Sequence, residues 1–498
     1  MPTPHGLFLY PIFIRLFDFL FSQIVRFVDA ICPGCRPFWN RCSHFVQQLT
    51  INLVLGLSIA VIVMSLHNNY RMVEFEDINV DWLMSFYRGS VPNPDKPIFP
   101  FVWINIDEQT YQAWNEPLLT PRDKLQQLLH FAVSGQASVI VVDIDLSYPR
   151  DPSKQKLAVL TQANLQLYHY LKDYEVKHCQ DTCPHIIFMR SFRKLLKSDK
   201  SYYPAQQKTF LDDIVVKSPH LHWASVQFDR EEDLVLRRWR LWEKACTNEQ
   251  MNIVPSVPLL ALALISDPKQ GVSNLKQQLK KFLPEDCFHH LPKSGNDLNQ
   301  TIIIADQQLH SQPSRLNKRV FYTIPWRLSD DEQRPNVPDG RFLLNELPAL
   351  NVLKHPDADG SIWLHNSITV IGGSYVESHD LHATPIGWMP GALVLINAIH
   401  SILQYGELNA PPNWLLLLMI AGVIVLMSFL LTYFDSFWGM TLLGLGIILL
   451  ILPLSFYFFK YGTWLNFTIP LLIVQWRQMA ADIVQWRQAA ANQEKRGN

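Results

Sequence analysis

The chain has 498 residues, of which 48% are hydrophobic and 17% are charged. Its 43 lysine and arginine residues are balanced by 44 aspartate and glutamate residues, which leaves a formal net charge of -1. Because proteins that bind nucleic acid carry a basic surface, this balance sets nucleic-acid binding aside.

Residues 1–46 are expected to associate with a membrane. Residues 7–31 are apolar apart from polar residues at every third or fourth position: Arg15, Asp18, Ser22, Arg26 and Asp29. That spacing places the polar residues on one stripe of a helix. An interfacial helix on the inner leaflet is the favoured interpretation because embedded charges are costly, and a fifth span with its stripe against a partner helix is the alternative. A cleavable signal peptide is not expected, because the run is charged and lacks a small-residue cleavage site.

A short cysteine-rich stretch follows this segment. Cys32, Cys35, Cys42 and His44 form a Cys-x2-Cys-x6-Cys-x-His pattern, whose ligand types can hold zinc. The prolines and the glycine between the cysteines already explain a tight turn between two membrane-associated helices. A turn is therefore the favoured interpretation, and neither a metal nor another cofactor is predicted here.

Four uncharged apolar runs are candidates for membrane spans: residues 50–66, 414–434, 437–459 and 461–476. A span needs about 20 largely apolar residues, and the second and third runs meet this requirement best. The first is at the lower limit, and the last is short and carries Asn466 and Pro470. We predict one transmembrane helix within residues 47–68 and three within residues 413–476.

The charges that flank these runs predict the orientation of the chain, because basic residues mark the cytoplasmic side of a span. Arg36 and Arg41 precede the first run, acidic residues follow it, and Arg477 and Arg487 follow the last run. Four crossings then place both ends inside, with residues 477–498 as a short cytoplasmic tail. Residues 69–412 form a large exported domain in this topology.

The exported domain is expected to have an α/β fold. Residues 101–106 (FVWINI) and 137–144 (ASVIVVDI) are compact apolar runs, and residues 122–133 between them have helical periodicity. A strand, a helix and a strand of these lengths predict a right-handed crossover in a mostly parallel sheet with covering helices on both faces. Further β-rich runs lie at residues 301–304 and 367–371, and a helix is expected at residues 391–404. An α-helical membrane region completes the predicted fold class.

Polar residues follow the expected strands at the edge where parallel sheets bind ligands. Asp107 comes after the first strand, and Asp143 and Asp145 end the second. A second cluster follows the strand at 367–371 and the Gly372-Gly373-Ser374 turn: Glu377, His379, Asp380, His382 and Thr384. We expect a shared cleft at the carboxyl edge of the sheet. Helix caps are an equally common role for aspartates at strand ends.

No metal centre or catalytic centre is predicted for the exported domain. His379, Asp380 and His382 resemble a metal-binding cluster, but two histidines three residues apart are a weak signal without a third ligand. The sequence has no Gly-x-Ser-x-Gly elbow, no His-Glu-x-x-His and no kinase or cyclase signature. We therefore do not expect an enzyme.

Four cysteines fall within the exported part, where disulfides form: Cys179, Cys183, Cys246 and Cys287. Four cysteines allow three pairings. The sequence alone does not choose among these pairings.

Two stretches of the exported domain resemble a known family. The motifs INIDE, Pro121-Arg122 and SVIVVDIDLSYP, followed later by ITVIGGSYVESHDLHATPIGWMPG, are similar to the type-two CHASE domain, the second family of cyclase- and histidine-kinase-associated extracellular sensory domains. The order of the motifs, and the pattern of one span, an external sensor and three closing spans, agree over roughly residues 50–475. Matching positions imply a sensing core of Asp107, Arg122, Asp143, Asp380, Thr384, Pro385 and Gly391. With Asp145 and His382 from the strand-end clusters, these polar residues are our ligand-binding candidates.

The resemblance implies a bacterial sensor in the inner membrane, with a large periplasmic or extracellular domain and an undefined ligand. Family members often carry a cyclase, a kinase or another effector after the last span, whereas only residues 477–498 follow here. The output is therefore expected to pass through a separate protein partner in the membrane, cytoplasm or envelope. The alternative is a structural anchor or docking subunit of an envelope or secretion assembly.

The tail suggests how copies of the chain associate. Apolar residues recur there at alternating steps of four and three: Leu472, Trp476, Met479, Ile483, Trp486 and Ala490. This spacing is typical of a coiled-coil seam and predicts a homodimer or a higher oligomer. A single amphipathic helix on the membrane surface, with tryptophan anchors, explains the pattern equally well.

Overall fold

The computed structural model divides into two compact units. It describes residues 43–65, 70–90, 96–147, 162–179, 183–193, 203–247, 250–283, 287, 301–310, 314–328, 335–355, 360–434 and 436–465. The first unit comprises Met1–Phe75, Pro412–Leu454 and Asn466–Asn498, and the second comprises Glu76–Pro411 and Ser455–Leu465. The predicted features at residues 7–31, at Cys32, Cys35 and Cys42, and at 472–490 lie outside the described residues.

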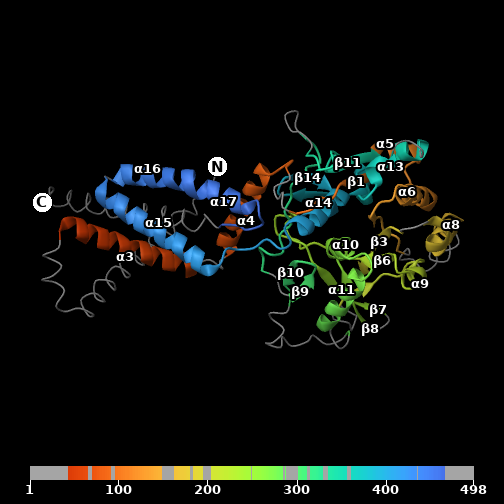
Figure 1. Cartoon of the computed structure of the whole chain (residues 1–498), viewed down its shortest axis with the longest axis horizontal. Coiled ribbons are helices and arrows are strands. Elements are labelled where there is room, and N and C mark those ends of the chain that lie inside the picture. Colours follow the sequence, from red (N-terminus) through yellow and green to blue (C-terminus); the bar gives the residue numbers. More distant parts are fainter. Residues whose placement is uncertain are drawn as a thin grey trace, which may run out of the picture. The chain divides into compact units, whose positions relative to one another are not determined.

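The described part of the first unit is helical (Figure 1). Its elements are α3 (His44–Ser65), α15 (Asn413–Tyr433), α16 (Ser436–Gly446), the π-helix η5 (Ile447–Ile451) and the start of α17 (Leu452–Phe459). Helices α3 and α15 pack closely because Gly56 has no side chain: a Cβ built there would lie 2.8 Å from Cγ2 of Ile424. Asn52 of α3 also donates a hydrogen bond of 3.2 Å to Oγ1 of Thr432.

Two helices in the described part of the chain are long and apolar enough to cross a membrane, Trp414–Tyr433 and Thr441–Phe459. Both coincide with predicted spans. Helix α3 contains a shorter apolar stretch, Phe45–Val61, which overlaps the first predicted span. The fourth predicted span differs at its start, because residues 461–465 form a turn and a β-bridge instead of a helix. The rest of that run, from residue 466, lies outside the described residues.

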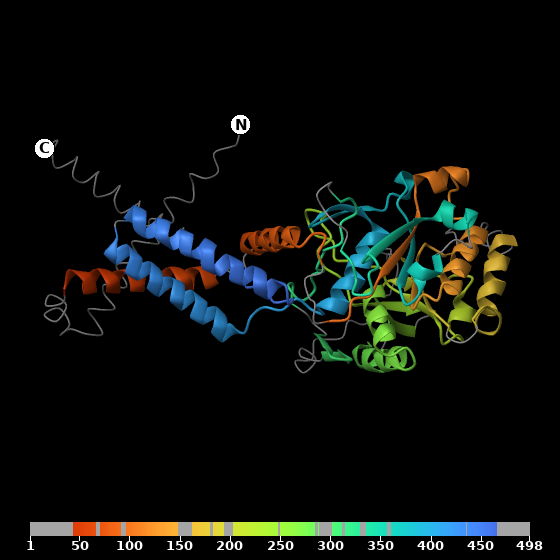
Figure 2. The same cartoon turned by 45° about the horizontal axis from the view of Figure 1, so that its top comes forward.

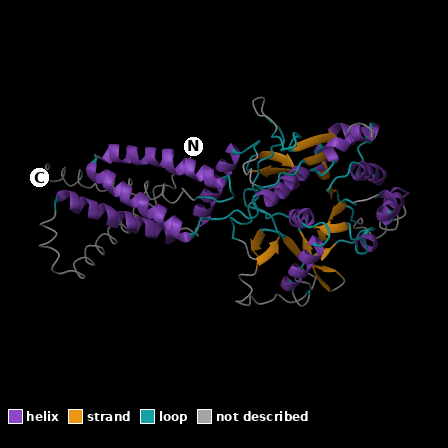
Figure 3. Ribbon diagram, in the orientation of Figure 1, coloured by secondary structure: helices purple, strands orange, loops and turns teal. Residues whose placement is uncertain are grey.

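The second unit is built on a six-stranded sheet in the order β11-β1-β12-β2-β3-β6 (orange in Figure 3). Every neighbouring pair of its strands is parallel. The strands are β1 (Phe101–Ile106), β2 (Val139–Asp143), β3 (His185–Met189), β6 (Leu221–Ala224), β11 (Leu344–Pro348) and β12 (Ile368–Gly373). The predicted α/β fold is therefore confirmed. Strands β1 and β2 are consecutive strands in the sequence, but β12, which comes much later in the chain, lies between them in the sheet.

Helices cover both faces of this sheet, which explains why its strands are apolar without alternation. On one face, α6 (Arg122–Ser134) and α8 (Gln162–Lys172) share a buried core with Val102 and Ile140. On the other face, α10 (Val257–Ser266) and α14 (Gly391–Gln404) pack against each other and against the central strands (Figure 2). All six residues of β1 are consequently buried.

Smaller elements surround the central sheet. The remaining strands are β4 (Phe192–Arg193), β5 (Ala205–Gln206), β7 (Trp242–Thr247), β8 (Gln250–Pro255), β9 (Thr301–Ile304), β10 (Gln307–His310), β13 (Leu381–Thr384) and β14 (Gly387–Pro390). The remaining helices are α4 (Tyr70–Phe86), α5 (Glu108–Ala113), η1 (Tyr174–His178), α9 (Asp212–Val215), α11 (Gly271–Leu279), η2 (Lys280–Phe282), α12 (Ala349–Lys354), α13 (Gly360–Leu364) and η4 (Val376–Ser378). The predicted strand at 301–304 pairs with β10 in an antiparallel hairpin outside the central sheet.

Buried ion pairs hold the part of α4 that belongs to the second unit, from Glu76 onward, in place. Nε of Arg237 donates to Oδ2 of Asp81 at 2.8 Å. Arg319 donates to both Asp77 and Asp81, and Arg238 also donates to Asp77. Arg237, Arg238 and Arg319 are only 6%, 3% and 1% exposed. Helix α4 is thus fixed by charges that come from distant parts of the chain.

We expect Arg319→Met to lower the free energy of unfolding by about 3–5 kcal/mol, because it leaves two buried carboxylates with less compensating charge. The matched control is Asp339→Asn, which removes the half-exposed partner that lies 2.6 Å from Arg341. Loss of such a surface pair should cost at most about 1 kcal/mol. Chemical unfolding of the two variants gives the comparison, and equal losses would contradict a buried role for Arg319.

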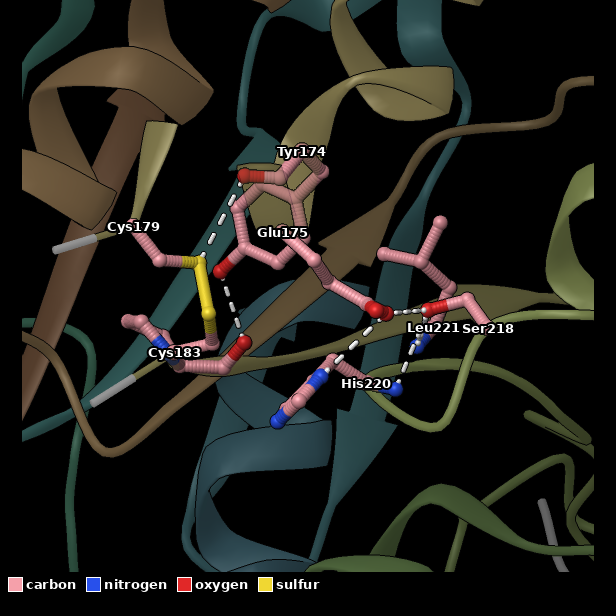
Figure 4. The surroundings of a disulfide bond; sticks show 8 residues. Tyr174, Glu175, Cys179, Cys183, Ser218, His220 and Leu221 are labelled. Atoms are coloured by element: carbon pink, nitrogen blue, oxygen red, sulfur yellow. Dashed lines mark hydrogen bonds and ion pairs between the residues drawn. A yellow bond between two sulfur atoms is a disulfide. The ribbon is translucent and has the colours of Figure 1, made fainter. Parts of the chain in front are cut away.

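The structure selects one of the three cysteine pairings, Cys179–Cys183 and Cys246–Cys287. Figure 4 shows the first disulfide beside η1, where the hydroxyl of Tyr174 donates to the carbonyl of Pro184 at 2.7 Å. This disulfide ties η1 to the start of β3.

The two disulfides close loops of very different length, with sequence separations of 4 and 41 residues. Loop-closure entropy predicts that replacing the first pair of cysteines by serine costs about 2 kcal/mol and replacing the second pair about 4 kcal/mol. Urea unfolding of the two double variants tests this order. A larger loss for the Cys179 and Cys183 variant would contradict it.

Candidate functional site

A cavity of about 700 Å³ lies at the carboxyl edge of the central strands. Ile106, Asp143 and Gly373, at the ends of β1, β2 and β12, form part of its lining. The strand registers pair Ile106 with Gly373 and Gly372 with Asp143, so the three strand ends are level. A cavity thus lies at the edge where a shared cleft is expected, and it brings together Asp143, Asp145, Asp380 and His382 of the predicted residues.

The path of the chain explains why a cleft forms at this point. From β1 and β2 the chain continues to α6 and α8 on one face of the sheet, whereas from β12 it continues to α14 on the other face. Connections that leave adjacent strands in opposite directions open a crevice between them. The β13–β14 hairpin, which precedes α14, closes one side of this crevice.

Asp143 is held where α14 approaches the sheet most closely. A Cβ built on Gly372 would lie 2.7 Å from Cβ of Ala392 and 3.3 Å from Cβ of Asp143, so only glycine fits between them. Burial, and then the charge of Asp380, raise the pKa of Asp143 to about 8. At neutral pH Asp143 is therefore protonated and can donate a hydrogen bond into the cavity.

Asp380 stands at the amino end of α14. A Cβ on Gly391 would lie only 2.3 Å from Oδ2 of Asp380, so the glycine makes room for the carboxylate. The positive end of the helix dipole favours a negative charge at this position. Oδ1 of Asp380 also lies 2.8 Å from Nε2 of His382, and both residues line the cavity.

Asp145 and Arg122 organise the neighbouring loop. Asp145 lines the cavity, and its Oδ1 accepts a hydrogen bond of 2.8 Å from the amide of Ser147. Arg122 is buried and donates from Nη2 to the carbonyl of Asp145 at 2.8 Å. Burial lowers the pKa of Arg122 to about 10, although the charge of Asp145 opposes this shift. Arg122 thus supports the loop that carries Asp145.

The other candidates have local structural contacts. Asp107 caps α5, with Oδ1 accepting from the amide and hydroxyl of Thr110 at 2.8 and 2.6 Å. The hydroxyl of Thr384 donates to the carbonyl of Gly387 at 2.5 Å, within the β13–β14 turn. His379 follows η4 in a left-handed conformation with φ of 50°. None of Asp107, Thr384 and His379 is among the described residues that line the cavity.

The described parts of the chain contain no group of three or more His, Cys, Asp or Glu side chains arranged to hold a metal ion. The backbone of His44 forms the first residue of α3. Cys32, Cys35 and Cys42, the other members of the predicted cysteine–histidine pattern, lie outside the described residues.

Sequence reasoning missed the apolar rim of the cavity. Leu118, Leu234 and Trp388 line the cavity and are nevertheless 97%, 73% and 64% exposed. Leu118 and Leu234 come from two separate loops, and Trp388 comes from strand β14. A β-bridge between Val235 and Ala383 brings the loop of Leu234 to the β13–β14 hairpin. Large apolar side chains in otherwise polar segments were the sequence signal that could have identified this rim, because exposed apolar groups mark interaction sites.

Residues 55–431 match the CHASE2 domain family. The chain belongs to this family. CHASE2 domains are extracellular sensor domains, and the match covers the whole of Glu76–Pro411, which contains the central sheet and the cavity. The predicted resemblance is confirmed over these residues. No curated protein and no solved structure matches the chain in the corresponding comparisons.

The raised pKa of Asp143 makes the stability of the CHASE2 domain depend on pH. A buried carboxyl group of this kind stabilises the fold fully below its ordinary pKa of 3.8, and that stability is lost as the pH rises towards about 8. Asp143→Asn keeps a neutral side chain of similar size and should remove this decline. The thermal midpoint of the variant minus that of the wild type should therefore increase between these two pH values.

The buried His185 and His222 do not disturb this comparison. Burial lowers their pKa values to about 4 and about 3, which gives the opposite pH dependence in both proteins and cancels in the difference. Asp306→Asn, at a side chain that is 75% exposed, is the control. A pH-independent difference for Asp143→Asn would contradict the assignment.

Proposed function

We propose that this protein is a membrane-anchored sensor that binds a ligand in the cavity and relays the event through its membrane helices to a separate protein partner. The observation that carries the proposal is that α14 forms a wall of the cavity through Gly391, Val394 and Leu395. The chain then continues from α14 through residues 405–412 directly into α15. A ligand that displaces α14 therefore acts on a segment connected to an apolar helix.

Contacts within the second unit support a relay from α14 to two membrane helices. Beyond α14, the amide of Asn409 donates to the carbonyl of Gly462 at 2.9 Å, and the amide of Trp464 donates to the carbonyl of Asn409 at 2.9 Å. Gly462 and Trp464 follow α17, which ends the apolar helix Thr441–Phe459. The ligand must bind one conformation more tightly than the other, because equal affinity shifts no equilibrium.

The proposed setting is the bacterial inner membrane, which the chain crosses several times with the CHASE2 domain on the periplasmic or extracellular side. Membership of an extracellular sensor family and two apolar helices of sufficient length support this setting. We further propose a homodimer or higher oligomer, with output through a partner protein and without catalysis by this chain.

The proposal is tested by crosslinking at positions 479, 483 and 486 of the tail. Single cysteines are placed there in full-length protein in lipid nanodiscs, after Cys32, Cys35 and Cys42 are replaced by serine. The neutral Asp143→Asn variant is expected to change crosslinking several-fold at pH 9, where the Asp143 carboxyl (pKa about 8) is ionised in the wild type, and to have little effect at pH 6. Asp306→Asn is the control. Identical crosslinking of wild type, Asp143→Asn and Asp380→Asn at both pH values would contradict the relay.

A docking subunit of an envelope or secretion assembly is the second candidate, and the exposed rim of Leu118, Leu234 and Trp388 favours it. An apolar patch of this kind fits a protein partner as well as a small ligand. Purification in mild detergent separates the two functions. A stoichiometric envelope protein that is lost in Leu118→Ser and Trp388→Ser variants supports docking, and recovery of a dimer alone counts against it.

A further inference from the structure

Helix α4 has two apolar faces, one of which is buried in the domain while the other is about half-exposed. Val80, Leu83 and Met84 are at most 1% exposed and pack into the second unit beside the ion pairs of Asp77 and Asp81. Ile78, Trp82 and Phe86 lie at steps of four on the opposite side and are 53%, 42% and 58% exposed. Because the ion pairs fix the rotation of α4, this second face cannot turn inward.

The exposed face of α4 lies beside the end of an apolar helix. The ring centroids of Trp82 and Phe86 are 5.9 and 5.0 Å from that of Phe456, and the hydroxyl of Tyr87 donates to the carbonyl of Phe456 at 2.5 Å. All four residues belong to the second unit. Phe456 lies near the end of Thr441–Phe459, which is long and apolar enough to cross a membrane.

The residues that follow Phe456 have the composition of a membrane–water boundary. Tyr457 and Tyr461 are 59% and 39% exposed, and Nζ of Lys460 lies 5.7 Å from the ring centroid of Tyr461. Tryptophan and tyrosine are enriched at this boundary, where lysine extends its charge into water. Two separate segments thus bring boundary residues to one place.

We infer that Ile78, Trp82 and Phe86, together with Tyr457 and Tyr461, form a surface that contacts lipid at the outer face of the membrane. This inference rests on the proposed membrane anchoring. The five residues are called the lipid-contact surface. Along α4, positions 78 to 86 extend over about 12 Å at 1.5 Å per residue. The polar zone of a bilayer adds about 5–7 Å on each side of the hydrocarbon core, so an inclined α4 fits within its depth.

A lipid surface suits this face better than a second copy of the chain. Aromatic side chains bury about 150–250 Å² each, so half-exposed Trp82 and Phe86 together supply about 150–250 Å², to which Ile78 adds less than about 150 Å². A stable protein interface needs about 800 Å² from each partner. Phe456 of the same chain also covers part of Trp82 and Phe86, which leaves a narrow stripe. Lipid chains and headgroups adapt to such a stripe without a matching surface.

The test measures the depth of nitroxide labels in full-length protein in nanodiscs. Labels are attached at Ile78→Cys, Trp82→Cys and Phe86→Cys, one at a time, with Cys32, Cys35 and Cys42 replaced by serine. Val425→Cys, on the apolar helix Trp414–Tyr433, is the membrane reference, and Leu118→Cys, at the cavity rim, is the water reference. Collision rates with oxygen and with a water-soluble nickel chelate are compared at each position.

We expect the oxygen-to-nickel ratio at the three α4 positions to be several-fold higher than at position 118 and to approach the ratio at position 425. Ratios equal to that at position 118, with a membrane-like ratio at position 425, would overturn the lipid-contact surface and leave the anchoring intact. A water-like ratio at position 425 would overturn the proposed anchoring itself. Spin–spin broadening at the α4 positions would show that a second copy covers this face, which also overturns the inference.

Discussion

The buried ion pairs between α4 and the arginines of the second unit are the constraint on which the rest of the structure depends. Burial, together with the charge of Asp77, raises the pKa of Asp81 by more than Arg319 and Arg237 lower it. Burial of such a pair costs desolvation free energy, but the pair fixes a defined geometry. An apolar replacement could pack in several rotations, whereas carboxylates that must meet guanidinium groups allow one. The orientation of α4, and therefore of its outward face, follows from this requirement.

A second constraint is the close approach of α14 to the sheet, which glycines make possible. Gly372 and Gly391 leave the space that Asp143 and Asp380 occupy, so two carboxyl groups lie near each other at the amino end of one helix. Burial, and then the nearby charge of Asp380, raise the pKa of Asp143 and make the protonation of the site sensitive to charge that enters the cavity. In the proposed sensor, a ligand that adds or removes charge there changes the position at which α14 is most stable. The proposal thus couples binding and helix position through one electrostatic site.

The predictable parts of the fold were those whose signal is local in sequence. The strands at FVWINI and ASVIVVDI could be identified because strands buried on both faces are continuously apolar, and their ends located Asp143 and Asp145. Helix α4 was missed because Asp77 and Asp81 lie on its buried side, which breaks the apolar periodicity that marks a helix. Their partners Arg238 and Arg319 are 161 and 242 residues away from Asp77 in the sequence, and no local sequence pattern indicates such pairs. The insertion of β12 between β1 and β2 is nonlocal in the same way.

The second unit holds α4 and the segment after α17 at two separate points, and we propose that this arrangement favours a sensor over a passive anchor. Asp77 and Asp81 fix α4, while Asn409 is paired through its backbone with Gly462 and Trp464 beyond α17. A single attachment would tether the domain but would let it move without consequence for the helices. In the proposed relay, two attachments convert a displacement inside the domain into a relative displacement of the attached segments, because packed interiors transmit strain. The cavity lies beside α14, which leads to the second attachment, and the ion pairs make the first attachment the fixed reference.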